Sequence, residues 1–177
     1  MKLYILALCL VLGTSLANAQ KNLVTNGGFE DDLDSWNGSG AKTSPWDFKS
    51  GKYSGVIITT DADNWTGIDQ TVSIPKKVQA LEFDAWIKAE NIVRGKDAWN
   101  GAIFTVQFFN KYGKKIGNDI NIITIAGDDP WTLHTKKVKL PDGADTFKIL
   151  LAMGYAKGVM LIDDVSATAI NVDDVDK

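Results

Sequence analysis

Strict alternation of apolar and polar residues over positions 81–90 is the feature that most constrains how this chain folds. Every second side chain from Leu81 to Ala89 is apolar, whereas charged residues and one tryptophan, Trp86, occupy the positions between them. Successive side chains of a β-strand point to opposite faces of its sheet. The pattern therefore predicts a half-buried strand whose register is fixed by its apolar face.

Comparable runs recur every ten to fifteen positions between clusters of Gly, Asp, Asn and Pro, and no helical periodicity extends beyond two turns. This arrangement is typical of an all-β protein with a β-sandwich fold. In residues 102–109 both alternating faces carry apolar side chains, which predicts a central strand. Strands are expected over residues 22–25, 54–60, 67–74, 79–90, 102–109, 119–125, 131–140, 146–153 and 159–168.

Residues 1–19 have the three parts of a cleavable secretory signal peptide. Lys2 precedes an apolar run from Leu3 to Leu12, and Ala17-Asn-Ala19 supplies the small residues of a cleavage site. The run is too short to span a bilayer, although a membrane anchor at the N-terminus is the alternative. We expect a secreted protein, extracellular or periplasmic, that is not inserted in a membrane. Cleavage would remove Cys9, the only cysteine, so the exported domain would have no disulfide.

The remaining chain has the length of one domain, and no linker-like stretch divides it. We expect a β-sandwich over residues 20–170, followed by a frayed, aspartate-rich tail over residues 171–177. The formal net charge is −3 and Arg94 is the only arginine, so the composition argues against nucleic acid or an anionic membrane as a partner.

Three segments show a family resemblance that spans residues 22–167. They are Asn22-Leu-Val-Thr-Asn-Gly-Gly-Phe-Glu30, Asp63-Asn-Trp-Thr-Gly-Ile-Asp-Gln70 and Leu161-Ile-Asp-Asp-Val-Ser166. In this order they resemble the opening strand, an Asp-Asn-Trp-Gln-Gly segment and the closing strand of carbohydrate-binding modules of families 4, 9 and 22. The resemblance implies a jelly-roll β-sandwich like that of galactose-binding domains, and noncovalent binding of a polysaccharide or oligosaccharide.

The resemblance also implies a structural calcium ion that ties the opening strand to the closing strand. Glu30 and Asp163 stand at the matching positions, and backbone carbonyls near Lys52 would complete the ligand set. Calcium requires several oxygen ligands, and carboxylates and carbonyls supply them. The alternative is that Asp163 and Asp164 are polar residues at the end of a strand.

Carbohydrate recognition needs flat aromatic rings that stack on pyranose C–H faces, and amides or carboxylates that bind hydroxyl groups. Trp65 is the first candidate, because its segment resembles one that carries a sugar-stacking tryptophan in the xylan-binding family. Trp86 is the second, and we expect it beside Asp84 and across its strand from the neighbourhood of Gln107. The full set of candidate carbohydrate-binding residues is Trp65, Trp86, Asn64, Asp84, Gln107, Trp46, Trp99 and Tyr155. Any tryptophan can instead be a packing residue, the role we assign to Trp36 and Trp131.

One strand departs from the family pattern. Xylan-binding members offer a tyrosine and an acidic residue on the strand before the closing one, but here that strand reads Lys148-Ile-Leu-Leu-Ala-Met153. Leu151 and Met153 cannot bind a hydroxyl group. Either the site uses other strands or the sandwich serves another purpose. The alternative function is a structural or adhesion module that binds a protein partner at the cell surface.

The sequence offers little for catalysis. The exported chain would contain no cysteine and a single histidine, His134, so a Cys-His dyad or a site with several histidines cannot form. A pair of carboxylates can hydrolyse a glycosidic bond, and the chain has many acidic residues. No pair stands in a recognisable catalytic motif, so we expect a non-catalytic binding module rather than a glycan hydrolase or lyase.

Overall fold

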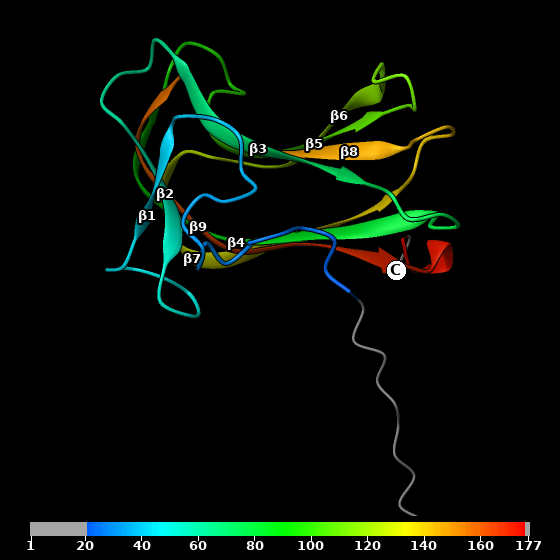
Figure 1. Ribbon diagram of the computed structural model, residues 1–177. Helices are drawn as coiled ribbons and strands as arrows, with labels where there is room; N and C mark the ends of the chain where they lie inside the picture. The colour runs from blue at the N-terminus through cyan, green and yellow to red at the C-terminus, as the bar shows by residue number, and fades with distance from the viewer. Residues whose placement is uncertain (1–20, 176–177) are drawn as a thin grey trace, which may run out of the picture.

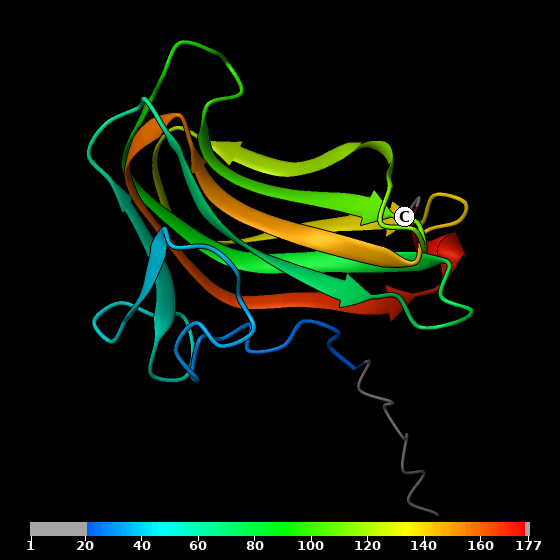
Figure 2. The same ribbon diagram turned by 45° about the horizontal axis from the view of Figure 1, so that its top comes forward.

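Nine strands form two antiparallel sheets in the computed structural model, which describes residues 21–175 (Figures 1 and 2). One sheet has the strand order β1-β2-β9-β4-β7 and the other has the order β3-β8-β5-β6. The strands are β1 (Ala41–Ser44), β2 (Ser54–Thr59), β3 (Trp65–Ser73), β4 (Ala80–Arg94), β5 (Gly101–Phe109), β6 (Lys115–Ile125), β7 (Gly127–Lys139), β8 (Thr146–Gly154) and β9 (Ala156–Ile170). The all-β sandwich expected from the sequence is confirmed.

The core lies between the two sheets, and the alternating face of β4 forms much of it. Leu81, Phe83 and Ile87 are fully buried, as the apolar pattern predicted. The Phe83 ring meets Phe108 of β5 and Phe147 of β8 edge-on, with centroid separations of 6.3 and 5.2 Å. Such edge-to-face contacts across the two sheets add to the stabilisation from apolar burial.

Strand β5 is central in its sheet and is covered on both faces, which confirms the prediction for residues 102–109. Phe104 and Val106 point into the core and are fully buried. On the opposite face Ile103 is 5% exposed and Thr105 is 9% exposed. The outer face of this sheet is therefore sheltered at its centre.

The strand expected at residues 22–25 is wrong, because this segment makes hydrogen bonds without forming a regular ladder. Strand β2 pairs with β9 only over residues 158–162, which leaves the rest of that edge of β9 open. There the Asn22 side chain donates to Val165 O and accepts from Ala167 N, at 3.1 and 2.9 Å. A side chain thus supplies some of the contacts that a strand would make, and the backbone of Leu23 and Gly27 also bonds to this edge.

Strand β1 was not predicted. It has four residues, pairs only with β2, and its sequence, Ala41-Lys-Thr-Ser44, has no apolar alternation. Strand β4 continues past the expected residue 90 to Arg94, and its pairing with β9 resumes at Val93 after a register shift between Glu90 and Val93.

The proposed signal peptide at residues 1–19 lies outside the described residues. At the other end, where a frayed tail was expected, Val172–Asp174 form a single 3₁₀ turn. Between residues 21 and 175 there is no helix with the length and hydrophobicity that a membrane span requires.

Candidate functional site

A cleft of about 430 Å³ crosses the outer face of the four-stranded sheet. Alternation along β5 points Phe104 and Val106 into the core and Thr105 and Gln107 into this cleft. Strand β6 adds three polar side chains beside them, and tryptophans stand at one end. We call this the sheet cleft, and its principal side chains are Trp65, Trp99, Thr105, Gln107, Asp119 and Asn121.

Two tryptophans leave wide ring surfaces open at the sheet cleft. Trp65 opens β3 and is 45% exposed, and Trp99 lies in the loop between β4 and β5 and is 51% exposed. The Trp65 indole lies over Gly154, its partner in β8. A Cβ atom at that glycine would stand 2.9 Å from the indole, so only glycine lets the ring lie against the strand.

Asp119 is the charged group of the sheet cleft and is held by two donors. Gln107 Nε2 donates to Asp119 Oδ2 at 2.9 Å, and Lys115 Nζ donates to Asp119 Oδ1 at 2.6 Å. Burial raises the pKa of the Asp119 carboxyl, but the hydrogen bonds from Lys115 and Gln107 outweigh it and the net pKa is lowered. Asp119 is therefore an ionised acceptor at neutral pH.

Asn121 extends this polar edge along β6. Its Oδ1 accepts from Thr105 Oγ1 at 3.4 Å, and its Nδ2 donates to Thr124 Oγ1 at 3.2 Å. Asp119, Asn121 and Thr105 were not predicted as cleft residues from the sequence. Alternation in β5 places Thr105 beside Gln107, but only the pairing of β5 with β6 shows that Asp119 and Asn121 lie next to them.

The structure brings five of the predicted carbohydrate-binding residues to this side of the molecule. Trp65, Trp99 and Gln107 line the sheet cleft itself. Tyr155 lies edge-on to Trp99, with ring centroids 5.6 Å apart, and its N–H donates to Asn64 O at 3.1 Å. Asn64 and Tyr155 thus support the aromatic end of the cleft.

Trp86 and Asp84 lie on the outer face of the other sheet. We expected Trp86 to lie across its strand from the neighbourhood of Gln107, and this is wrong, because β4 pairs with β9 and β7 while β5 belongs to the opposite sheet. The Lys49 ammonium sits 3.8 Å from the Trp86 ring centroid and covers that face. Asp84 accepts hydrogen bonds from Thr135 and Ser166.

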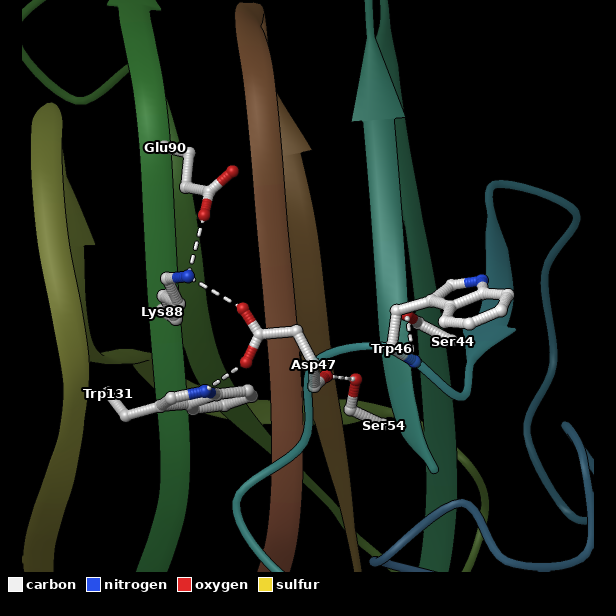
Figure 3. A network of polar contacts seen from close by, with 7 residues as sticks. All are labelled: Ser44, Trp46, Asp47, Ser54, Lys88, Glu90 and Trp131. Carbon is white, nitrogen blue, oxygen red and sulfur yellow. Dashed lines mark hydrogen bonds and ion pairs between the residues drawn. The ribbon is translucent and has the colours of Figure 1, made fainter. Parts of the chain in front are cut away.

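Trp46 also belongs to this second face, in the loop of residues 45–53 that joins β1 to β2. Figure 3 shows Trp46 pointing away from its neighbour Asp47, whose carboxylate lies between Lys88 and Trp131. Asp47 accepts from Lys88 Nζ at 2.6 Å and from Trp131 Nε1 at 2.8 Å. Trp46 is 90% exposed and stands apart from the sheet cleft.

The two packing tryptophans take different positions. Trp36 is 7% exposed and stacks on Phe29 with ring centroids 5.4 Å apart, as expected for a packing residue. Trp131 is half-buried on β7 and in addition anchors Asp47 through its indole N–H.

Leu151 and Met153 are fully buried and point into the core. The family resemblance suggested that these two residues face the cleft. This was wrong, because they lie on the inward face of β8. Alternation along β8 turns Lys148 and Leu150 outward instead, and Leu150 lines the sheet cleft. The departure from the family pattern at these two residues concerns packing and leaves the cleft unaffected.

Glu30, Lys52 and Asp163, the residues considered for calcium, lie around one junction. Glu30 Oε1 accepts from the Lys52 and Tyr53 N–H groups at 2.7 and 3.1 Å. Asp163 is fully buried, and its Oδ2 accepts from two backbone N–H groups of the 45–53 loop, at 2.8 and 3.0 Å. Burial raises the pKa of the Asp163 carboxyl. Lys52 thus contributes its N–H to Glu30.

Backbone strain accompanies this junction. Phe29, next to Glu30, has φ of 58°, and Asp164, next to Asp163, has φ of 47°. Non-glycine residues rarely adopt this left-handed region unless their surroundings impose it. Within residues 21–175 no three acidic, histidine or cysteine side chains form a metal-binding group.

No protein-family model and no curated protein matches this sequence. Solved structures do match its fold. The enzymatically active domain of tailspike protein 4 from Bacteriophage CBA120 superposes with a TM-score of 0.66 and 17% identity over 84% of this chain. The present chain spans 21% of that domain.

Two further matches have the size of this chain. A family 16 carbohydrate-binding module has a TM-score of 0.58 and 20% identity, covering 83% of this chain and 99% of the module. The CBM22-1 xylan-binding domain of Paenibacillus barcinonensis Xyn10C has a TM-score of 0.59 and 18% identity, covering 88% of this chain and 99% of the domain. This protein therefore has the jelly-roll β-sandwich fold of carbohydrate-binding modules.

Proposed function

We propose that this protein is a secreted, non-catalytic module that binds a polysaccharide or oligosaccharide in the sheet cleft. The observation that carries the proposal is the pairing of exposed Trp65 and Trp99 rings with the polar edge formed by Gln107, Asp119 and Asn121. Aromatic faces stack on pyranose rings, and fixed amides and carboxylates bind their hydroxyl groups. Matched structures include a xylan-binding domain and a module in complex with β-1,4-galactotriose, which supports the same ligand class.

The charge arrangement of the sheet cleft supports binding without hydrolysis. Glycosidases usually place two carboxylic groups on either side of the bond, one of them protonated as the acid. Among the described residues of this cleft, Asp119 is the only carboxylate, and the lowered pKa keeps it ionised. It is suited to accept hydrogen bonds from sugar hydroxyl groups.

We further propose that a calcium ion binds between Glu30 and Asp163 as a structural ligand. The Asp163 carboxylate is fully buried, and within residues 21–175 no basic side chain pairs with it. A Cβ at Gly28 would stand 3.8 Å from Oδ1 of both Asp163 and Asp164 and 3.9 Å from Glu30 Cγ, so the side chains of these three residues lie around this glycine. Carboxylate oxygens are the hard ligands that calcium prefers, and backbone carbonyls near Lys52 would supply the remaining ligands.

The test of the carbohydrate proposal is a glycan array followed by affinity electrophoresis, with and without a calcium chelator. Trp65→Ala should weaken binding of the retained polysaccharide by about tenfold or more, the scale expected for loss of one stacked ring and its apolar contact. Trp46→Ala is the matched control, because Trp46 is more exposed and lies in the 45–53 loop, away from the sheet cleft. It should bind like the wild type.

Unchanged affinity in a folded Trp65→Ala variant would remove Trp65 from the site. If the folded wild type retained no glycan, carbohydrate binding would be wrong, and a screen for a protein partner would follow.

A further inference from the structure

A second pocket, of about 640 Å³, lies beside the aromatic end of the sheet cleft. It is formed by the β2–β3 loop, the β4–β5 loop and the turn between β8 and β9. The two longer loops stand at the same end of the sandwich, at the upper left of Figure 1. We call it the loop pocket, and the side chains relevant here are Asp63, Lys96, Asp97, Trp99, Asn100 and Tyr155.

Trp99 lines both the loop pocket and the sheet cleft. Its ring is 51% exposed, and Tyr155, 40% exposed, meets it edge-on at an interplanar angle of 85°. The two hollows are therefore adjacent parts of one surface, separated by a shared aromatic wall. A chain-like ligand in the sheet cleft has a path past Trp99 into the loop pocket.

Asn100 gives the loop pocket an unused hydrogen-bond donor. The residue is 2% exposed, and its Oδ1 accepts from Asp97 N at 2.8 Å. Its Nδ2 is buried and has no hydrogen-bond partner among the described residues. Buried polar groups in native proteins are almost always paired, so an unpaired amide beside a pocket indicates that a bound ligand supplies the missing acceptor.

The charged side chains of the loop pocket are also free to bind. Asp97 takes part in its turn through backbone groups, donating to Asn100 Oδ1 and accepting from Asn100 N. The Asp97 carboxylate has no ion-pair partner within residues 21–175. The same is true of the Asp63 carboxylate and the Lys96 ammonium. Gly95 lets the β4–β5 loop lie close to the turn at Tyr155, because a Cβ there would stand 2.6 Å from Tyr155 O.

We infer that the loop pocket is a second subsite that holds a further neutral sugar unit of the chain bound in the sheet cleft. An aromatic wall, two free carboxylates and an unpaired amide suit a ring with several hydroxyl groups. This inference rests on the proposed carbohydrate binding. It adds that affinity depends on chain length, because short oligosaccharides fill only the sheet cleft and longer ones also reach the loop pocket.

The experiment measures the dissociation constant for ladders of xylo-, gluco- and galacto-oligosaccharides of about two to six units by isothermal titration calorimetry. The Asp63→Ala, Asp97→Ala double variant removes both carboxylates of the loop pocket and leaves the turn's backbone hydrogen bonds in place. The matched control is Asp142→Ala, Asp145→Ala, which removes the same charge from the β7–β8 connection at the other end of β8.

In the wild type and the control, affinity should rise again beyond the length that fills the sheet cleft. The loop-pocket variant should lose this last rise, binding the longest oligosaccharide about tenfold more weakly while binding the shortest as the wild type does. Equal affinity of this variant and the control at every length would overturn the second subsite.

Trp65→Ala separates the two proposals. If it weakens binding at every length while the loop-pocket variant binds as the wild type does, carbohydrate binding stands and the second subsite is wrong. If the folded wild type binds no ladder and no polysaccharide, both are wrong.

Discussion

The Asp47 carboxylate fastens the 45–53 loop to the outer face of the five-stranded sheet. It accepts from Lys88 Nζ at 2.6 Å and from Trp131 Nε1 at 2.8 Å, and the Asp47 carbonyl accepts from Ser54 Oγ at 2.6 Å (Figure 3). The hydrogen bond from Lys88 is the main reason why the pKa of Asp47 is lowered. The same bond, with a second one to Glu90, raises the pKa of Lys88.

Asp47→Asn should lower the free energy of unfolding by about 1 kcal/mol at neutral pH. This is the energy of a hydrogen bond between charged groups, reduced because solvent screens the two charges. Solvent screens this ion pair because the Asp47 and Lys88 side chains are 36% and 26% exposed. A lowered carboxyl pKa stabilises the fold above the ordinary value of 3.8 and ceases to do so as pH falls through the lowered pKa. Urea unfolding at several pH values measures the difference between wild type and variant.

The difference should therefore be constant through neutral pH and shrink in acid below pH 3.8. The difference in stability should also shrink in alkali. The raised pKa of Lys88 stabilises the fold below pH 10.5, and this contribution is lost as pH rises through the raised pKa. A difference that did not vary with pH would contradict the ion pair as its source.

At the scale of elements, the opening segment, residues 22–30, lies along the edge of β9 that β2 leaves open. Gly27 sets the distance between this segment and β9. Val165 N donates to Gly27 O at 2.9 Å, and a Cβ at Gly27 would stand 2.0 Å from Val165 O. The left-handed backbone of this segment lies at Asn26 and Phe29, with φ of 51° and 58°.

Gly27→Ala should destabilise the protein by about 3 kcal/mol, because the methyl group meets backbone that cannot move without breaking the contact with β9. Gly28→Ala is the adjacent control. A Cβ there has no neighbour nearer than 3.8 Å, so its effect should stay within about 0.5 kcal/mol. Thermal or urea unfolding of the two variants decides the matter, and similar losses in both would argue against the steric explanation.

At the scale of the whole molecule, calcium would couple three separate parts of the chain: the opening segment, the 45–53 loop and β9. A ligand that binds only the folded state stabilises it by about 1.4 kcal/mol for each tenfold increase in concentration above its dissociation constant. The melting temperature of the wild type should therefore rise with added calcium and fall with a chelator, as calorimetry would measure.

Glu30→Gln is the variant that isolates this effect. It keeps an Oε1 acceptor for the N–H groups of Lys52 and Tyr53 and removes the charge. The melting temperature of this variant should respond much less to calcium. A wild type whose melting temperature ignored both calcium and chelator would show that these carboxylates serve only as acceptors for backbone N–H groups.

Residues of the core were predicted from the sequence more accurately than residues of the site, for a physical reason. Leu81, Phe83 and Ile87 were assigned correctly to the core because alternation is a local property of one strand. Trp86 was placed in the wrong neighbourhood because strand order is not local, and β4 and β5, although consecutive, belong to different sheets. Leu151 and Met153 were misread because the family comparison fixed no register for β8.

The sequence by itself determined the all-β sandwich, the inward face of β4 and the tryptophans available for stacking, because apolar periodicity and side-chain chemistry are written residue by residue. Only the tertiary structure decided which tryptophans share a surface. Pairing of β3, β8, β5 and β6 gathers Trp65, Gln107 and Asp119 around one cleft, and loop packing sets Trp99 between that cleft and the loop pocket. Such neighbours depend on contacts between residues far apart in the chain, and those contacts are fixed only when the two sheets pack.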